Sequence, residues 1–351
     1  MPKIWKRTVM TTLGVALSAA ALWFFLRKVQ GHWEEVGQAF GRASYAYLIP
    51  SVGFIALMYG LRVLRWRVFL DHVRRVRYYD IAAATCIGFM SSCVLPLRAG
   101  EVIRPYVLHK KSGLRFGHAA GTAMGLERVF DLIGACFLLA LTLLLLPIGK
   151  FSGPPAQWLS AIPGKGAFFA GIALAAMSAL VVVAFLPGLT VRFARFFLKA
   201  LPHSWALALE GFISSAVESL AFLKRPGRVA TALLLSLALW FCYPLSTWAV
   251  ARGFGLEIPF AGILLAQVMV TVAVALPQAP GFIGMYQAAA MTALQLYGVA
   301  QADAAAFAIM MWAVNVFPIT LVGLGLLWYE GLSLRGLRLK AEDAEGAEHQ
   351  G

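Results

Sequence analysis

Long apolar runs separated by short polar segments form the dominant pattern of this chain. Six runs have about the 20 residues that a membrane-spanning helix needs, and we expect helices at about 8–26, 45–61, 120–147, 167–187, 229–251 and 305–329. Two further apolar stretches, 81–97 and 261–297, are interrupted by proline and glycine. The pattern predicts an all-α polytopic membrane protein, with 8–26 kept as a helix and not removed as a signal peptide.

The two interrupted stretches are broken in the same way. Leu, Pro and Gly of Leu95–Gly100 recur in Leu276–Gly281 with a constant offset of 181 residues. Proline and glycine at membrane depth free backbone groups that lipid cannot satisfy, so such breaks persist where the backbone lines a cavity in the protein. Paired breaks in two halves of a chain point to a transporter-like binding site.

The distribution of Lys and Arg predicts how the chain crosses the membrane. If each broken stretch is a re-entrant hairpin and six helices span, 23 of the 30 Lys and Arg lie on the side of the N-terminus and 6 on the other. Cytoplasmic loops carry such an excess. We therefore expect both termini and 98–119 in the cytoplasm, and 298–304 outside.

The same arrangement predicts an inverted repeat of helix, helix, re-entrant hairpin and helix. The first copy occupies 1–150 and the second, which starts on the opposite side, occupies 151–330. Within the second copy, 190–223 interleaves bases with aromatic residues, as in an amphipathic helix on the cytoplasmic leaflet. We expect 331–351 to be a disordered cytoplasmic tail.

Composition agrees with a membrane protein and narrows the function. Hydrophobic residues make up 60% of the chain and charged residues 13%, about half the charged fraction of soluble domains. The net charge of +14 lies in short loops, which favours an anionic leaflet over nucleic acid as its partner. Four cysteines sit in apolar stretches without C-x-x-C spacing, so no metal or other cofactor is predicted.

The first break carries the ionisable candidates. Ionisable groups at membrane depth are costly and usually face a partner or a wet cavity. A half-helix that starts near Gly100 would point free N–H groups at an anion, and arginine has a planar fork suited to phosphate. The alternative is that these arginines are ordinary loop bases. The candidate substrate-binding residues here are Arg98, Gly100, Glu101 and Arg104.

The second break has no formal charge but is rich in backbone-breaking residues. Its glycines allow unusual dihedrals and a close approach of a ligand to the backbone. The alternative is a kinked spanning helix with no ligand role. The candidates in this segment are Pro277, Gln278, Pro280, Gly281 and Gly284.

Two more charged groups lie near predicted helix ends. Glu127 and Asp131 are four residues apart and share a helix face, and Arg128 and Asp131 are three apart, so Arg128 can neutralise one carboxylate locally. The remaining charge could pair with Arg62, Arg65 or Arg98, or take up a proton. The alternatives are snorkelling side chains at 127–131 and, for 62–67, an aromatic and basic interface anchor.

Together these motifs resemble a flippase-like family related to the transmembrane region of lysylphosphatidylglycerol synthase. One departure is Gln287, in a place where that family often has a glutamate, which weakens any mechanism that needs a second carboxylate there. The motifs that carry the resemblance are Arg62-x-x-Arg65-Trp66, Leu95-Pro96-x-Arg98-x-Gly100-Glu101-x-x-Arg104, Glu127-Arg128-x-x-Asp131 and Pro277-x-x-Pro280-Gly281-x-x-Gly284.

The resemblance implies a multi-pass protein of the bacterial inner membrane that handles a polar lipid, phosphate-bearing or of glycolipid or hopanoid type. We expect a flippase or lipid transporter that binds the headgroup between the two breaks, with the arginines on its phosphate. Bifunctional relatives carry a soluble aminoacyltransferase domain, for which these 351 residues show no counterpart. The alternatives are an integral-membrane enzyme or accessory subunit of lipid biosynthesis, which would have lipid-biosynthesis enzymes as partners, and a non-transporting scaffold.

Overall fold

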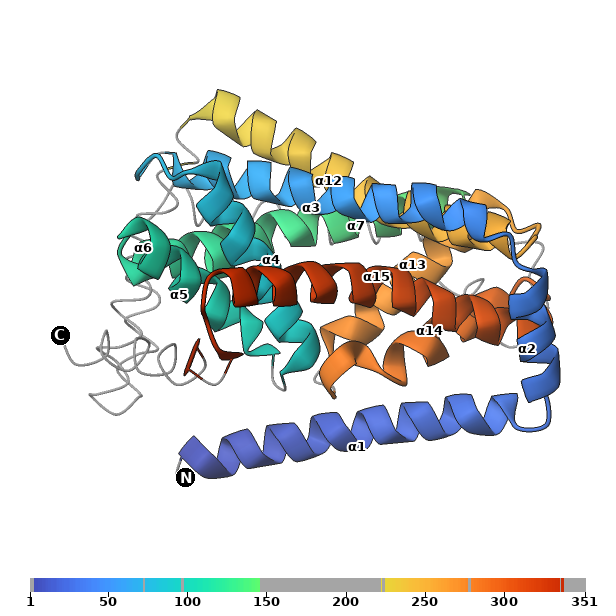
Figure 1. The fold of residues 1–351 in the computed structure, drawn as a ribbon. Helices are drawn as coiled ribbons and strands as arrows, with labels where there is room; N and C mark the ends of the chain where they lie inside the picture. The colour runs from blue at the N-terminus through green and yellow to red at the C-terminus, as the bar shows by residue number, and fades with distance from the viewer. Residues whose placement is uncertain are drawn as a thin grey trace, which may run out of the picture.

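The computed structural model describes residues 3–71, 73–95, 98–145, 222, 225–276, 279–334 and 336–337, and these ranges are helical with no strand. Figure 1 shows four long helices, α3, α7, α12 and α15, running alongside one another, with α1 along one flank. The helices are α1 Lys3–Val29, α2 Trp33–Arg42, α3 Leu48–Leu70, α4 Tyr78–Val94, α5 Gly100–Ser112, α6 Phe116–Ala120, α7 Glu127–Leu145, α12 Pro226–Gly253, α13 Phe260–Ala275, α14 Met285–Gln295 and α15 Gln301–Tyr329.

Four segments within the described ranges are long and apolar enough to cross a membrane. They are Tyr45–Leu70, Phe116–Leu145, Pro226–Gly253 and Gln301–Tyr329, and each contains or overlaps an expected span. The expected helix 8–26 lies inside α1. The expected helix 167–187 falls outside the described residues, as does the amphipathic segment 190–223 except Phe222.

The first residues of the segment 331–351 pack against the bundle. Leu337 is buried, and Leu332 and Leu334 pack against the same hydrophobic cluster. These leucines pack there because they have apolar surface to cover. Residues 338–351 lie outside the described residues.

Each break separates two helices, and at the first break the second helix lies beyond the expected stretch 81–97. In the first, α4 ends at Val94 and α5 starts at Gly100, while Pro96 and Leu97 lie outside the described residues. In the second, α13 ends at Ala275, and a 3-10 turn at Pro280–Phe282 precedes α14. The helices of each pair pack against each other.

Small residues let α4 and α5 approach closely. A Cβ atom at Gly100 would lie 1.9 Å from the carbonyl oxygen of Gly88, and one at Gly88 would lie 2.5 Å from the Cβ of Arg104. Real Cβ atoms never approach that closely, so neither glycine can be replaced without separating the helices. Gly100 therefore has a packing role besides the role proposed for it at the start of α5.

Contacts between distant segments define two opposite ends of the bundle. At one end, Lys111 of α5 pairs with Asp80 of α4 at 3.7 Å and with Glu330, just after α15, at 2.6 Å. The bond from Lys111 lowers the pKa of Glu330, and the 2.8 Å hydrogen bond from Tyr79 to Glu330 raises the pKa of Tyr79 to about 12. These contacts join α4, α5 and the end of α15 at this end of the bundle.

At the other end, the chain before α3 meets the end of α12 and the start of α15. Ser44 donates a backbone hydrogen bond to Gly253 at 2.7 Å, and Arg42 pairs with Asp303 at 3.4 Å. The outer ends of α13 and α14 also meet, because a Cβ at Gly262 would lie 3.0 Å from the ring of Tyr297.

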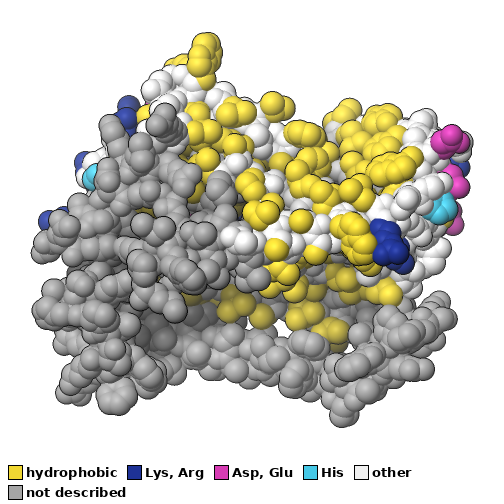
Figure 2. All heavy atoms as spheres, turned by 90° about the horizontal axis from the view of Figure 1, so that it is seen from below, with side chains coloured by type: hydrophobic (Ala, Val, Ile, Leu, Met, Phe, Trp, Pro, Cys, Tyr) yellow, Lys and Arg dark blue, Asp and Glu magenta, His cyan; other side chains and the backbone are white. Residues whose placement is uncertain are grey.

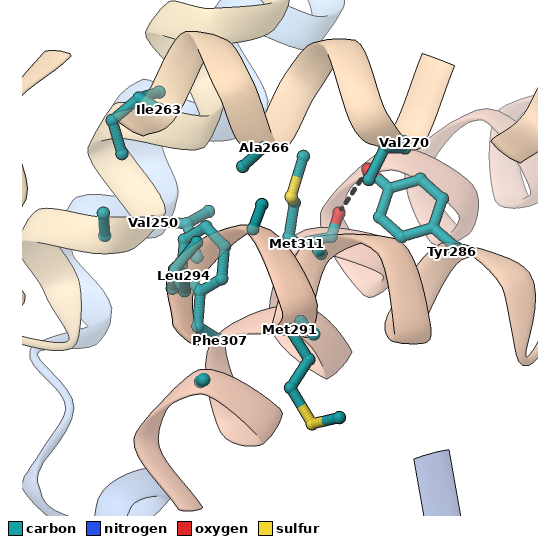
Figure 3. Close-up of a cluster of buried hydrophobic side chains, with 14 of the residues drawn as sticks. Val250, Ile263, Ala266, Val270, Tyr286, Met291, Leu294, Phe307 and Met311 are labelled. Carbon is teal, nitrogen blue, oxygen red and sulfur yellow. Dashed lines mark hydrogen bonds between the residues drawn. The ribbon is translucent and has the colours of Figure 1, made fainter. Parts of the chain in front are cut away.

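The outside of the bundle is apolar and the inside is a packed core. In Figure 2 hydrophobic side chains cover most of the visible described surface, and the charged ones lie toward its ends, as a bilayer requires. Figure 3 shows part of the larger core cluster, where Phe307 and Leu294 pack beside Val250. Tyr286 reaches the carbonyl of Met311 at 3.4 Å in the same view.

Candidate functional site

A cavity of about 440 Å³ lies inside the bundle, and its lining comes from both interrupted stretches. Arg98, Gly100 and Glu101 contribute from the first, and Val274 and Phe282 from the second. The volume falls in the roughly 300–1,000 Å³ range of small-molecule sites. The structure thus brings the two breaks, 181 residues apart in sequence, to one cavity.

Arg104 of α5 is bound to Glu127 at the start of α7 by two hydrogen bonds. Both Nη atoms of Arg104 reach the carboxylate, and the Nη2–Oε1 distance is 3.2 Å. The guanidinium also lies 3.9 Å from the ring centroid of Trp66 and donates to Thr85. Arg104 is 5% and Glu127 2% exposed, so this pair is a fixed part of the cavity wall that depends on mutual neutralisation.

Asp131, one turn further along α7, receives both arginines of α3. The Arg65–Asp131 distance is 2.8 Å and the Arg62–Asp131 distance is 3.2 Å. Trp240 of α12 adds a hydrogen bond to the same carboxylate at 3.3 Å, and Gly134 leaves the room in which that indole sits. Of the partners that the sequence left open for the remaining carboxylate, Arg62 and Arg65 bind Asp131.

The interface-anchor alternative is wrong for Arg62, Arg65 and Trp66, whereas Arg67 at the end of the motif is exposed. Arg65 and Trp66 are fully buried and Arg62 is 5% exposed. The physical reason is that Asp131 and Glu127 neutralise these bases inside the protein, which lets α3 continue as a helix to Leu70. We expected this helix to end near 61, because the sequence does not reveal where a buried base finds its carboxylate.

Glu101 is shared between Arg98 and Arg128. Its Oε1 lies 3.5 Å from Arg98 and 2.5 Å from Arg128. Arg128 therefore reaches across to α5 and pairs with a carboxylate outside its own helix. Arg98 also donates to the carbonyl of Val274, in the last turn of α13, so its side chain joins the first break to the second.

Arg98 adopts a backbone conformation that is rare outside glycine. Its φ is 52°, in the left-handed region that costs most side chains strain. Glycine would adopt this conformation without strain, but the chain has an arginine here. The backbone thus holds the guanidinium at the cavity, where the side chain is 34% exposed.

The described charges of the site do not cancel. Arg62, Arg65, Arg98, Arg104 and Arg128 face only Glu101, Glu127 and Asp131, which leaves a formal surplus of two positive charges. Within the described residues, the buried Nε atoms of Arg62, Arg65 and Arg104 have no hydrogen-bond partner. A surplus of positive charge with unused donors favours an anion.

The second break supplies backbone in place of charge. Gly281 and Gly284 have φ of 75° and 89°, and Phe282 has 60°, so the expectation of unusual dihedrals at the glycines is confirmed. Trp312 donates to the Gly281 carbonyl, and a Cβ at Gly284 would lie 2.6 Å from the backbone of Ser18 in α1. Pro280 begins the 3-10 turn, and Pro277 and Gln278 lie outside the described residues.

Gln287 has a structural task in α14. Its Oε1 accepts a 2.8 Å hydrogen bond from the backbone N–H of Gly284, and its side chain is buried. The side-chain oxygen of an amide can therefore cap the start of α14, as a carboxylate oxygen at this position would also do. Gln287 does not line the cavity.

Sequence reasoning missed an aromatic and amide wall of the cavity. These residues lie in apolar helices at no distinctive spacing, so no pattern in the sequence marks them. The amides of this wall are Gln267 and Asn315. The missed lining residues include Tyr59, Phe89, Trp240, Tyr243 and Tyr286.

The polar groups that line the cavity are mainly of four kinds. Arginine, carboxylate, tyrosine and amide groups line it, and within the described ranges no three His, Cys, Asp or Glu side chains gather to hold a metal ion.

Comparison with known proteins places this geometry in a family. The search of curated proteins gives no match. Residues 11–323, nearly the whole chain, match the family described as Lysylphosphatidylglycerol synthase TM region. All the candidate residues, from Arg62 to Gly284, fall inside that match. The chain is a multi-pass membrane protein that belongs to the lysylphosphatidylglycerol synthase TM-region family.

Proposed function

We propose that this protein is a flippase or transporter of a polar lipid in the bacterial inner membrane, with the headgroup bound in the cavity between the two breaks. The observation that carries the proposal is the cavity itself, which both interrupted stretches line and whose arginines outnumber its carboxylates. Such a site holds an anionic or zwitterionic headgroup, while the acyl chains stay in lipid. The substrate is a phosphate-bearing lipid or one of glycolipid or hopanoid type.

We further propose that α4–α5 and α13–α14 are re-entrant hairpins of an inverted repeat. Support comes from where the outer ends of each pair meet. Asp80 and Lys111 join the outer ends of α4 and α5 near Glu330, whereas Gly262 and Tyr297 meet near the opposite end of the bundle. In Figure 1 the two pairs accordingly lie toward opposite ends. Entry from both ends gives a central site access to either side in turn.

The orientation can be tested by labelling. We propose that the α5 end, with both termini, is cytoplasmic, because Lys and Arg concentrate there. After the four native cysteines are replaced, Ser112→Cys and Gln301→Cys should react with an impermeant thiol reagent from opposite faces, Gln301→Cys from the outside. Labelling of Ser112→Cys from outside would contradict both the orientation and the re-entrant α4–α5 pair.

A transport assay tests the function. Purified protein in liposomes should move headgroup-labelled lipids between leaflets without changing their mass, because the site binds and needs no reactive group. Several lipids are tested in parallel: phosphatidylglycerol, phosphatidylethanolamine, a glycolipid and a neutral diacylglycerol. Gly284→Val should slow movement, since the φ of 89° and the contact with α1 leave no room for a branched side chain.

A Gly53→Val variant is the matched control for Gly284→Val, because a Cβ at Gly53 would meet nothing within 4 Å.

The competing function is an integral-membrane enzyme or accessory subunit of lipid biosynthesis, and the same assay separates this function from transport. A covalently altered lipid, formed without added proteins, would reject transport in favour of the enzyme. Leaflet exchange that is equally fast in liposomes with and without the protein would also reject transport.

A further inference from the structure

Glu101 stands where two arginines of the cavity converge. Both ion pairs use the same oxygen, Oε1, at 3.5 Å from Arg98 and 2.5 Å from Arg128. Glu101 is 30%, Arg98 34% and Arg128 50% exposed at the side chain. This group is therefore accessible, unlike the buried pairs of Arg104 and Arg65.

One carboxylate oxygen satisfies two guanidinium groups poorly. Arginine prefers a two-pronged contact in which separate oxygens accept separate N–H groups. A phosphate diester offers two unesterified oxygens, so it can give one to each arginine. The Arg98–Glu101 distance of 3.5 Å, at the upper limit of a hydrogen bond, shows that Glu101 does not hold both partners tightly.

The surrounding charges favour an anion at this position. Glu101 lies in the first turn of α5, where the free N–H groups and the helix dipole attract negative charge. Arg104 lies further along the same helix and lines the same cavity. Arg104 is already paired with Glu127, so the surplus positive charge at the Glu101 position comes from Arg98 and Arg128, two bases that share one carboxylate.

We propose that Glu101 occupies the position between Arg98 and Arg128 that the substrate's phosphate takes, here called the phosphate seat. When the headgroup binds, Glu101 is displaced from both arginines. The ligand class is a phosphate diester, and we assign it to a lipid headgroup. Glu101 acts as a specificity-determining residue, because only an anion that contacts both arginines better than a carboxylate can replace it. It also promotes release, since its return to the arginines expels the headgroup. The inference rests on the proposed function.

Equilibrium binding tests the seat apart from transport. Fluorescent phosphatidylglycerol is titrated into purified protein in neutral detergent. Glu101→Gln should bind it about 5- to 10-fold more tightly, because an internal competitor with a charge-assisted bond is removed. Arg128→Gln should bind it about 10-fold more weakly, and the double variant should show no gain over wild type. In liposomes Glu101→Gln should move lipid more slowly, because release is impaired.

Asp303→Asn is the matched control. It frees Arg42 at an exposed site at the far end of the bundle and should leave affinity unchanged. Glu101→Ala is titrated beside Glu101→Gln, and the thermal stability of each variant is measured. A folding defect in Glu101→Gln is then not mistaken for a change in binding. Inorganic phosphate is the competitor that separates a lipid headgroup from a free anion. It should fail to displace the lipid at tenfold excess.

The outcomes are distinct. Equal or weaker binding by both folded Glu101 variants would overturn the seat, even if wild type transports lipid. Full displacement by inorganic phosphate would overturn its assignment to a headgroup. Tighter binding by the variants without any lipid movement by wild type would support the seat and reject the proposed function.

Discussion

Glu127→Ala is expected to destabilise the protein by about 3–5 kcal/mol, the usual cost of stranding a buried charge. Glu127 is almost fully buried and accepts two hydrogen bonds from Arg104, and Arg65 lies 3.7 Å away. Without it, Arg104 loses its carboxylate partner and Arg65 keeps only Asp131 inside the bundle. The expected result is a lower unfolding temperature in detergent and a lower level of protein in the membrane.

Two controls separate lost charge from lost volume. Glu127→Gln keeps the shape but removes the charge, and we expect most of the destabilisation to remain. Glu34→Ala removes a carboxylate from the exposed first turn of α2 and should change the unfolding temperature little. Unchanged stability in Glu127→Ala would mean that the Arg104–Glu127 pair is not needed to neutralise the bundle interior.

Arg98→Ala is expected to reduce lipid transport at least about tenfold, the effect of one lost charge-assisted contact of roughly 1.5–3 kcal/mol, while stability stays close to that of wild type. The side chain is one-third exposed, so little packing is lost. Its guanidinium links the first break, Glu101 and the end of α13. Leaflet exchange in liposomes and the unfolding temperature are measured on the same preparation.

The positive φ of Arg98 calls for a backbone control. Asparagine tolerates the left-handed region, so Arg98→Asn removes the guanidinium without forcing the turn to change. It should lose transport as Arg98→Ala does, and Arg98→Lys should keep part of it. Normal transport by Arg98→Asn would show that the guanidinium does not contact the headgroup.

Hydrophobic pattern was enough to predict the class of fold. Apolar runs near 20 residues predicted the four described spans, and the recurring Leu, Pro and Gly predicted where 81–97 and 261–297 break. These features are local, because a helix in lipid must satisfy its own backbone and proline or glycine interrupts it wherever it occurs. Helix ends were predicted less well, as α3 shows by continuing past its arginines to Leu70.

The sequence by itself also determined which residue types the site contains. The arginines and carboxylates stand out because few charges occur in apolar surroundings. It could not assign partners, since Arg65–Asp131 and Arg128–Glu101 join residues from different helices. Nor could it identify Trp240 or Tyr243 among many aromatic residues. Only the tertiary structure decided these contacts, because pairing depends on which helix faces meet, and here Gly88, Gly100 and Gly134 set how closely they approach.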